Sequence, residues 1–356
     1  MNYIWSKLKL LPFLEASINS VVSEKNYQFS DLFAGTWIVG RYFKEKWHSV
    51  TANDLQYYSY VLNRNYIGNC KSLEFLGLMR IIPKLKNYDV FQRKSQVLEL
   101  LNQLPAKKWF IYLNYAPAWT KDSEFERMYF TDENAMHCDA IRSEIEDWKI
   151  EKIITEDEYF FLLASLLEAA DKVANTASVY GAFLKKFKKS ALKPLTLIPA
   201  EFSRDSLDHQ VFQSDIWELI QTTSHDVVYL DPPYNERQYS ANYHILETIA
   251  RYDSPFIKWK TGVRDYSQQK SKYCKKSEVA PSFRQLIENL DANYIFLSYN
   301  DEWLMSLETI REIMSLRGEY GVFEKQYQRF KADKTERRKH KQDSVVEYLH
   351  YVKIQK

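Results

Sequence analysis

The sequence predicts an α/β protein in which one mostly parallel sheet is assembled from both ends of the chain and interrupted by a helical insertion. Three observations lead to this fold class. Strand-like and helix-like patterns alternate over residues 1–75, helical periodicity dominates residues 76–199, and strand-like patterns return over residues 200–356. Such alternation is typical of a parallel sheet. We therefore expect a sheet domain made of residues 1–75 and 200–356, with residues 76–199 as the insertion.

The first part of the chain alternates between the two patterns at short intervals. The patterns predict, in order, a helix over 11–22, a strand and turn over 27–35, a helix over 37–47, a strand over 48–54 and a helix over 55–67. The second of these strands ends on an acidic residue, Asp54. Its place is informative, because ligands of open α/β sheets bind outside the carboxyl ends of the strands.

The middle of the chain has the spacing of helices. Residues 158–173 are apolar on most faces, so we expect this helix to form the core of a helical subdomain. Strand patterns then return in three places: an acid-led apolar run over 226–234 that ends in a Pro-Pro turn, a buried strand over 292–300 and a last strand over 344–354.

Composition indicates an ordinary soluble globular protein, with 45% hydrophobic and 27% charged residues among 356. The formal net charge of +2 does not by itself indicate a nucleic-acid partner. Local charge is more informative: residues 325–341 hold eight Lys or Arg against two acids, and residues 185–193 hold five Lys. Each run alone is equally well explained as a solvated face or loop, but the two together favour a polyanionic partner.

The three cysteines, Cys70, Cys138 and Cys274, lie far apart and form no Cys-x-x-Cys pair. This spacing argues against a zinc site or a disulfide framework and fits a reducing cytosol. The first ten residues lack the continuous apolar core of a signal peptide, and the chain has no apolar run of membrane-spanning length. We therefore expect a cytoplasmic protein with no membrane association and no metal.

The strongest chemical signal is the stretch DPPY at 231–234, directly after the predicted strand VVYL. Pro232 and Pro233 fix the backbone and lack N–H donors, so the turn is rigid and its carbonyls stay available as acceptors. The Asp231 carboxylate beside a fixed carbonyl suits an exocyclic amine with two hydrogens, and Tyr234 offers a flat face to a planar ring. Methyl transfer to a nucleobase needs an amine held and stacked in this way. The alternative is a simple turn after a strand.

Together with this stretch, motifs along nearly the whole chain resemble DNA N6-adenine methyltransferases of the Dam-like, alpha-order type, especially those of restriction–modification systems. The matching segments are NYIWSKLKLLPF (2–13), DLFAGTWIVG (31–40), ND (53–54), FQSD (212–215), DPPYNERQYSANYHILE (231–247), YIFLSYN (294–300) and EYL (347–349). The resemblance implies a Rossmann-like methyltransferase sheet that uses S-adenosylmethionine and carries a helical target-recognition insertion.

The resemblance also implies a cofactor site. It assigns S-adenosylmethionine binding to Tyr3, Lys7, Asp31, Phe33, Ala34, Gly35, Asp54 and Asp215. Within this set, the turn at 33–35 would hold the methionine portion, Asp54 the ribose hydroxyls and Asp215 the adenine amine. Lys7 would pair with the cofactor's carboxylate. The plainer alternatives are that Asp54 caps a helix and that Lys7 is a surface charge.

The implied reaction is direct in-line methyl transfer to N6 of adenine in duplex DNA. Asp231 and the carbonyl of Pro232 would hold the target amine, and Tyr234 would stack on the base. The enzyme would contribute positioning and acceptors for the developing charge on N6. A base inside a duplex has to be flipped out to reach such a site. The insertion and the basic segments would grip phosphates and read the DNA site, and a cognate restriction endonuclease would act separately.

Tryptophans stand where the resembled family has glycine. Trp5 replaces the glycine of the amino-terminal motif, and Trp37 replaces the second glycine of the cofactor turn. Trp47, Trp259 and Trp303 also fall where we expect glycine in relatives. Trp109 and Trp119 are weaker cases, whereas Trp148 and Trp217 read as true tryptophans. The chain has 8 Gly in 356 residues, or about 2% against an average of about 7%.

Two explanations account for these tryptophans. We favour a codon hypothesis, in which UGA, read as glycine in some bacterial lineages, has been translated as tryptophan. The other is a chain that has lost its cofactor, with Trp37 closing the pocket, and that persists as a catalytically silent DNA-binding relative. Two further activities use a similar catalytic stretch. One is RNA adenine methylation, and the other is protein-glutamine methylation, whose enzymes usually have Asn in place of Asp231.

Overall fold

In the computed structural model of this chain, seven strands form one sheet in the order β3-β2-β1-β4-β7-β9-β8. The structure describes residues 7–233, 236–300, 304–328 and 344–355. The strands are β1 (Phe29–Asp31), β2 (Val50–Asn53), β3 (Gln210–Phe212), β4 (His225–Leu230), β7 (Ala292–Asn300), β8 (Gly318–Gln328) and β9 (Ser344–Ile354). The first five in the sheet order are parallel, and β9 is antiparallel to both of its neighbours. The sheet is therefore mostly parallel, as predicted.

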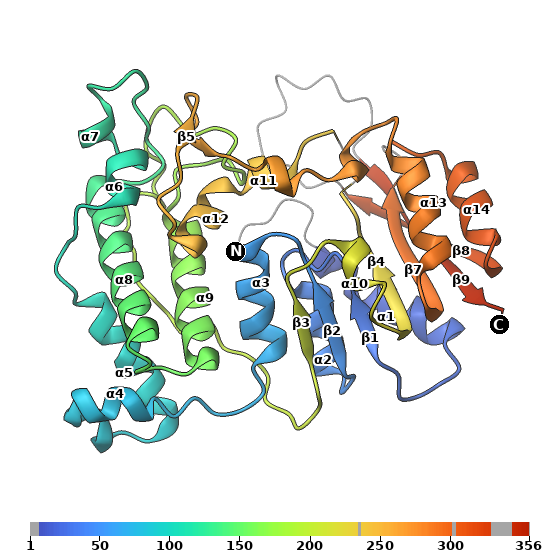
Figure 1. Cartoon of the computed structure of the whole chain (residues 1–356), viewed down its shortest axis with the longest axis horizontal. Coiled ribbons are helices and arrows are strands. Elements are labelled where there is room, and N and C mark those ends of the chain that lie inside the picture. Colours follow the sequence, from blue (N-terminus) through green and yellow to red (C-terminus); the bar gives the residue numbers. More distant parts are fainter. Residues whose placement is uncertain (1–6, 234–235, 301–303, 329–343, 356) are drawn as a thin grey trace. The chain divides into compact units, whose positions relative to one another are not determined.

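The chain divides into two compact units. A helical unit consists of Arg64–Ser206 and Ala241–Tyr266, and a sheet unit contains the other described residues. Figure 1 shows the strands of the sheet unit and, separately, the long helices of the helical unit. The functional division into a catalytic domain (1–75 and 200–356) and a recognition insertion (76–199) stays a prediction. In the structure, a second segment, which follows the DPPY stretch, folds with the helical unit.

Each face of the central strands packs against helices, because alternate residues of a strand point to opposite sides. Val228 and Leu230 of β4 join a core with α10 (Ile216–Leu219), α13 (Val279–Asn289) and α14 (Leu307–Ser315). On the opposite face, Phe29 of β1 stacks on Phe43 of α2 (Ile38–Glu45), with ring centroids 3.8 Å apart, and lies near Tyr229 of β4. Burial on both faces explains why these strands read as continuous apolar runs.

The remaining helices of the sheet unit are α1 (Leu11–Val21) and α3 (Tyr57–Asn63). Helix α1 has a proline in its first turn, where a missing N–H is tolerated, and it buries Leu11, Leu14 and Ile18. Residues Arg64–Gly68 continue α3 as a wider, π-helical turn at the point where the chain enters the helical unit.

The helical unit is organised around α8 (Asp132–Ile150) and α9 (Glu156–Val173). Helix α9 begins with a capping box between Thr155 and Glu158, and most of its residues are buried. Shorter elements pack around this pair: α4 (Leu76–Ile81), α5 (Val90–Asn102), α6 (Phe110–Tyr115), α7 (Pro117–Thr120) and α12 (His244–Arg251). The boundary between the two units falls within a further short helix, α11 (Tyr239–Asn242). The predicted buried helix over 158–173 is thus confirmed.

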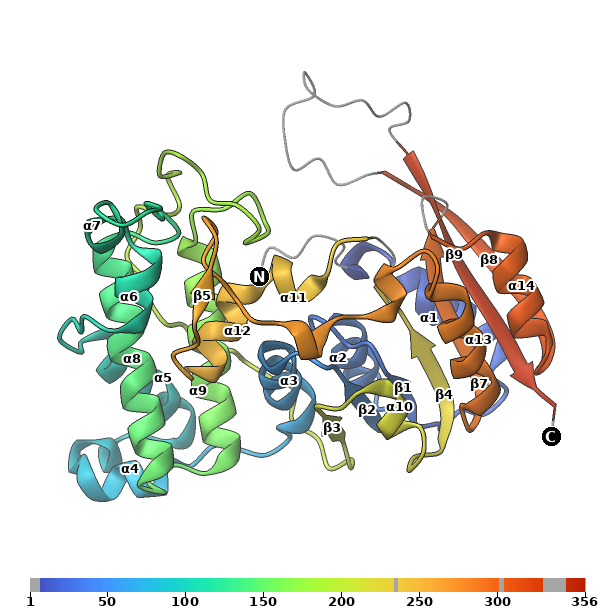
Figure 2. The ribbon, with the colours of Figure 1, turned by 45° about the horizontal axis from the view of Figure 1, so that its top comes forward.

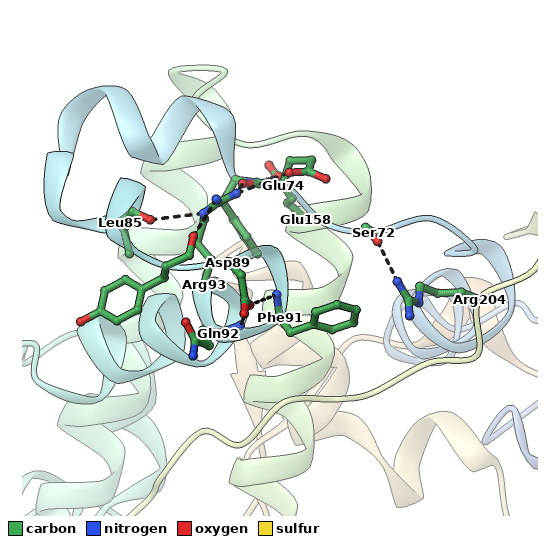
Figure 3. Close-up of polar contacts among 11 residues, drawn as sticks. Ser72, Glu74, Leu85, Asp89, Phe91, Gln92, Arg93, Glu158 and Arg204 are labelled. Atoms are coloured by element: carbon green, nitrogen blue, oxygen red, sulfur yellow. Dashed lines mark hydrogen bonds and ion pairs between the residues drawn. The ribbon is translucent and has the colours of Figure 1, made fainter.

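Helix α5 is fixed by a buried guanidinium. Arg93 donates to the main-chain oxygens of Glu74, Leu85 and Tyr88 at 2.5–3.3 Å, and Asp89 caps the helix by accepting from the amides of Phe91 and Gln92 (Figure 3). Because main-chain oxygens satisfy the N–H donors of the arginine, this cluster stabilises the fold.

The second segment of the helical unit is held by equally specific contacts. The fully buried Arg142 of α8 donates to the main-chain oxygens of Ile249 and Ala250 at 2.9 and 3.0 Å. Beyond α12, strands β5 (Ile257–Lys258) and β6 (Val263–Arg264) form a small antiparallel hairpin. These long-range contacts explain why a segment that follows the catalytic motif belongs to this unit.

Local patterns predicted the long elements well and missed those that depend on distant pairing. The predicted strands over 292–300 and 344–354 are confirmed residue for residue, and the other predicted strands and helices are found with shifted ends. Sequence analysis did not identify β3, β8 or the β5–β6 hairpin. No helix in the described parts of the chain is long and apolar enough to cross a membrane.

Candidate active site

The two main motifs meet because β1 and β4 are neighbours in the sheet. Asp31, the last residue of β1, is paired in register with Tyr229 of β4, two residues before Asp231. Strand order reverses between these two strands, since β2 and β3 extend the sheet on one side and β7, β9 and β8 on the other. The carboxyl ends of strands at such a switch point are where open α/β sheets bind ligands.

The turn after β1 is closed by main-chain contacts. The amide of Ala34 donates to the carbonyl of Asn53 at 2.9 Å, and the carbonyl of Gly35 accepts from the hydroxyl of Ser59 at 2.5 Å. Gly35 has a φ of 48°, a left-handed conformation that glycine adopts without strain. Phe33 is half-buried, with its ring edge-on to Tyr273 at 5.3 Å. The predicted cofactor turn thus exists as a tight, ordered turn.

Two side chains at the end of β2 tie the neighbouring strand ends together. The Asp54 carboxylate accepts from the amide of Gly35 at 2.9 Å and from the amide of Gln56 at 2.8 Å. The adjacent Asn53 exchanges hydrogen bonds with the main chain of Ser214 at 3.1 and 3.2 Å. Asp54 thus joins the turn after β1 to the end of β2 through its carboxylate.

Asp215 lies at the end of the neighbouring strand, β3. It caps α10 by accepting from the amide of Trp217 at 2.8 Å, and its side chain is otherwise exposed. The predicted acids after β1, β2, β3 and β4 therefore follow four adjacent strands. Adjacency along one edge is what an extended ligand such as a nucleoside requires.

The DPPY stretch lies beside a buried lysine. Lys7 Nζ lies 3.5 Å from Asp231 Oδ1 and 2.5 Å from Glu347 Oε1. Ser298 Oγ donates to the same glutamate oxygen at 2.7 Å. Lys7 and Glu347 are each 7% exposed at the side chain, whereas Asp231 is 20% exposed. Pro232 is buried and Pro233 half-buried.

Burial and neighbouring charge set the protonation of this group. Burial raises the pKa of Asp231 to about 6, opposed by the attraction of Lys7 and reinforced by the repulsion of Glu347. Burial lowers the pKa of Lys7, but the two carboxylates raise it by more, so the ammonium stays charged. Burial, followed by repulsion from Asp231 and Asp54, raises the pKa of Asp31 well above its usual range. Burial and mutual repulsion therefore disfavour the charged forms of these acids, and a cationic ligand at the strand ends would relieve that repulsion.

Part of the predicted site lies outside the described residues. Tyr3 and Tyr234 belong to that part, as do Trp5, Trp303 and most of the basic run over 325–341. Sequence analysis did not single out Glu347 and Ser298 as site residues. The sequence did contain a signal for Glu347, because it is a single acid within the apolar strand SVVEYLHYV. A buried acid needs a polar or charged partner, so such a residue indicates a buried polar group.

Three tryptophans have left-handed backbones. Trp37, Trp47 and Trp259 have φ values of 62°, 67° and 58°. Trp47 ends α2 with the bond pattern of a glycine cap: its amide donates to Lys44 and the amide of His48 donates to Phe43. All three belong to the set where glycine was expected. The other tryptophans in the described residues, Trp109, Trp119, Trp148 and Trp217, are not left-handed.

The helical unit presents an irregular loop with exposed lysines, here called the lysine loop (residues 184–195). Lys185, Lys186, Lys189 and Lys193 are exposed on it. Two buried asparagines fix its main chain. Asn175 bonds to main-chain groups of Leu184 and Lys188, and Asn134 bonds to those of Ala191, Lys193 and Leu195. The loop is therefore an ordered, positively charged surface.

The β5–β6 hairpin is anchored at its turn. Tyr115 donates to the carbonyl of Gly262 at 2.8 Å, and Arg127 donates to the carbonyls of Trp259 and Lys260 at 3.0 and 3.2 Å. Lys258 and Lys260 are exposed. In Figures 1 and 2 the hairpin lies at the end of the helical unit where α9 finishes, the end from which the chain leads into the lysine loop.

Comparison with known proteins gives independent information about the family of this chain. The family model described as D12 class N6 adenine-specific DNA methyltransferase matches residues 3–313. Type II methyltransferase M.NlaIII of Neisseria lactamica is 54% identical over 352 residues, which cover 98% of each chain. Type II methyltransferase M.CviAII of Paramecium bursaria Chlorella virus 1 is 36% identical over 100% of this chain and 99% of its own. Type II methyltransferase M.FokI of Planomicrobium okeanokoites is 37% identical over 99% of this chain and 52% of its own.

Proposed function

This chain belongs to the D12 class N6 adenine-specific DNA methyltransferase family, and we propose that it is the modification enzyme of a restriction–modification system that uses S-adenosylmethionine. Two relatives that align over nearly their full lengths are named Type II methyltransferases, which supports the restriction–modification assignment. The cognate endonuclease would be a separate protein that cuts the same site when it is unmethylated.

One observation carries the assignment of the site: the register that pairs Asp31 with Tyr229. This pairing brings the end of β1, where the turn begins, next to the end of β4, which Asp231 follows, at the point where strand order reverses. A methyl donor held by the turn and an amine held at Asp231 would then be neighbours, and proximity of the two reactants is the main demand of an in-line transfer.

The residues present fit S-adenosylmethionine, which supplies a methyl group already activated on a sulfonium cation. The buried Asp31 has a carboxylate oxygen with no hydrogen-bond partner among the described residues, and three carboxylates surround the strand ends. A cationic ligand would relieve the repulsion among these carboxylates. Phe33, Ala34 and Gly35 would line the methionine portion, Asp54 would accept from the ribose hydroxyls and Asp215 from the adenine amine.

At the catalytic stretch, Asp231 and the Pro232 carbonyl would accept from the two hydrogens of the target amine. The Asp231 carboxylate would also stabilise the positive charge that develops on N6. Tyr234 would stack on the flipped base. Lys7 was expected to pair with the cofactor's carboxylate. Its bonds to Asp231 and Glu347 instead favour a role at the catalytic carboxylate.

The helical unit would bind the DNA. The lysine loop would contact phosphates, because its ammonium groups are exposed and its main chain is fixed. The β5–β6 hairpin would approach the same duplex with Lys258 and Lys260. Phosphate contacts of this kind set the register of a protein on DNA, and a small number of contacts to base edges then select the sequence.

The test is a methylation assay with labelled cofactor on duplex DNA, RNA and protein, run in parallel, followed by methylation-sensitive sequencing of DNA from expressing cells. Label in N6-methyladenine of DNA at one sequence supports the proposal. Label confined to RNA or protein would favour the other methyltransferase activities, and DNA binding without transfer would favour a silent relative. The chain with its present sequence and its Trp5→Gly, Trp37→Gly variant are assayed side by side.

A further inference from the structure

Glu347 lies in β9, two strands away from β4, yet its carboxylate belongs to the same buried polar group as Asp231. Strand β7 separates β9 from β4 in the sheet, and Lys7 spans the gap by contacting both acids. Ser298, on the intervening β7, donates to Glu347 Oε1 at 2.7 Å. The two carboxylates and the ammonium therefore form one group drawn from both ends of the chain.

The lysine is shared unequally. Its ammonium lies 2.5 Å from Glu347 and 3.5 Å from Asp231, so it makes the shorter bond to the acid that is farther from the substrate. Glu347 is in turn fixed by Ser298, which limits its side-chain freedom. The distance to Asp231 is that of an ion pair rather than of a strong hydrogen bond.

We infer that Glu347 is a positioning residue for methyl transfer: it holds Lys7 close enough to Asp231 to stabilise the carboxylate, but out of direct competition with the target amine. This inference rests on the proposed role of Asp231 as the amine acceptor. An ammonium bonded directly to Asp231 would occupy a lone pair that the N6 amine needs. Without Lys7, the buried carboxylate would tend to protonate and lose its acceptor charge.

The charged and titratable groups around Asp231 define what removal of the Glu347 charge does. Lys7 and Glu347 act on it most directly, and Asp31 and Tyr229 face it from β1 and β4. Repulsion from Glu347 raises the pKa of Asp231, so a neutral side chain at this position lowers that pKa. It also frees Lys7 to move onto Asp231, which acts in the same direction.

The first experiment compares Glu347→Gln with its parent in single-turnover methylation over pH 5–8, with cofactor and DNA at saturation. We expect the plateau rate to fall by about 10- to 100-fold, as for a small misplacement of a reacting group. The KM for DNA stays within about twofold, and the acidic limb of the profile moves to lower pH. Glu347→Asp keeps the negative charge, so the acidic limb of its pH profile should stay where it is in the parent.

The matched control is Glu15→Gln. Glu15 also pairs with a lysine in the sheet unit, at 2.9 Å from Lys46, but this pair is more exposed and is not linked to Asp231 by any contact in the described residues. Its rate and pH profile should match those of the parent. An equal fall in rate in Glu15→Gln and Glu347→Gln would reduce Glu347 to a general stabilising residue and overturn the inference.

A double-mutant cycle with Lys7→Met tests whether Glu347 acts through the lysine. If it does, Glu347→Gln lowers the rate little further once Lys7 is Met. Additive effects in the double variant would overturn the inference, as would an unchanged rate and profile in Glu347→Gln. If neither the parent nor its Trp5→Gly, Trp37→Gly variant transfers a methyl group to DNA, the proposed function is refuted instead, so the two failures are distinguishable. DNA affinity measured for each variant separates misfolding from a change at the site.

Discussion

The main-chain amide of Gly35 donates to the carboxylate of Asp54 at 2.9 Å, which joins the turn after β1 to the end of β2. The same carboxylate accepts from the amide of Gln56 at 2.8 Å. A single side chain therefore shapes the turn and, in the proposed function, also accepts from the ribose. The two roles can be separated experimentally, because removal of the first affects stability and removal of the second affects cofactor binding.

We predict that Asp54→Ala weakens cofactor binding by about 10- to 100-fold, equivalent to about 1.4–2.7 kcal/mol, and lowers the unfolding free energy by about 1–3 kcal/mol. Calorimetric titration and urea unfolding measure the two effects. The control is Asp226→Ala, since Asp226 accepts from the amide of Gln28 at 2.9 Å near the start of β4, at the other end of the strand. It should lose stability only. Equal cofactor affinities in the two variants would contradict the ribose role.

The methylation rate should depend on pH through Asp231. Since burial raises the pKa of this acid to about 6, with Lys7 opposing and Glu347 adding to the shift, the carboxylate that accepts the amine forms as pH rises through about 6. We expect single-turnover rates to increase from pH 5 to pH 7 and then level off. Asp231→Asn should lower the plateau by about 10²-fold or more.

The raised pKa of Asp231 has the opposite effect on stability: the methylation rate should increase with pH, but the free energy of unfolding should decrease. The folded pKa of Asp231 lies above its unfolded value of about 3.9, so the folded state retains a proton that the unfolded state loses. Its contribution to stability is therefore present at low pH and declines as pH rises from about 4 to about 6. Asp231→Asn should remove this decline without lowering the unfolding free energy at pH 7.

For the rate prediction, a methylation rate that is flat between pH 5 and pH 7 would argue against Asp231 as the acceptor.

Trp47→Gly should stabilise the protein. Trp47 is 71% exposed and occupies the left-handed position of the α2 cap, where a side chain is disfavoured by about 1–2 kcal/mol. We expect a gain of about 1 kcal/mol in urea unfolding. The matched control is Trp119→Gly, which removes a similarly exposed indole (60%) from the helical backbone of α7 and should lower stability by about 1 kcal/mol. Destabilisation by both changes would show that packing by the Trp47 indole outweighs its strained backbone.

Trp37→Gly tests the cofactor turn itself. Trp37 combines a left-handed φ of 62° with an indole that is only 6% exposed, so the side chain packs inside the turn region. We expect tighter S-adenosylmethionine binding and faster methylation, and a further gain when Trp5→Gly is added. Trp47→Gly is the control, because it relieves the backbone outside the turn. If calorimetry gives the same dissociation constant for S-adenosylmethionine in the parent, Trp37→Gly and Trp47→Gly, the Trp37 indole does not obstruct the cofactor.

Changing Lys185, Lys186 and Lys189 to Gln should weaken DNA binding and reduce its dependence on salt. For every phosphate that the protein no longer neutralises, the slope of log K against log salt becomes shallower by about 0.9, so three such phosphates change it by about 2.7. The control changes Lys71, Lys84 and Lys86, which are also exposed and lie in the same unit near α4. Equal slopes in the two triple variants would remove the lysine loop from the proposed interface.

Local sequence patterns were sufficient for the long apolar strands. The runs over 292–300 and 344–354 are strands with the predicted bounds, because apolar alternation and length leave few other structures. Strand β3 was missed since its three residues are half-exposed and carry no apolar run. Strand β8, GEYGVFEKQYQ, is an edge strand with many polar residues, and its structure depends on pairing with β9.

The site followed the same division. Asp54, Asp215 and Asp231 were assigned from the sequence because motif and chemistry agree there, and their roles stay predictions. Glu347 was not assigned a role, because its partners are Lys7 and Ser298, which lie far away in sequence. Pairing over such separations is a property of the folded sheet. The left-handed backbones of Trp37, Trp47 and Trp259 likewise became visible only in the structure, and glycine adopts such a backbone without strain. The codon hypothesis for these positions stays a prediction.

In the proposed function the helical unit reads the DNA, and its discontinuity would then limit how this family member can acquire a new target sequence. Arg64–Ser206 and Ala241–Tyr266 fold together, through Arg142 bound to the carbonyls of Ile249 and Ala250 and through Tyr115 bound to that of Gly262. Recombination that imports only the longer block from a relative would leave a buried guanidinium facing a foreign main chain. Successful exchange would have to carry both blocks and keep the DPPY stretch between them, so we expect specificity in such chains to diverge mainly by point substitution.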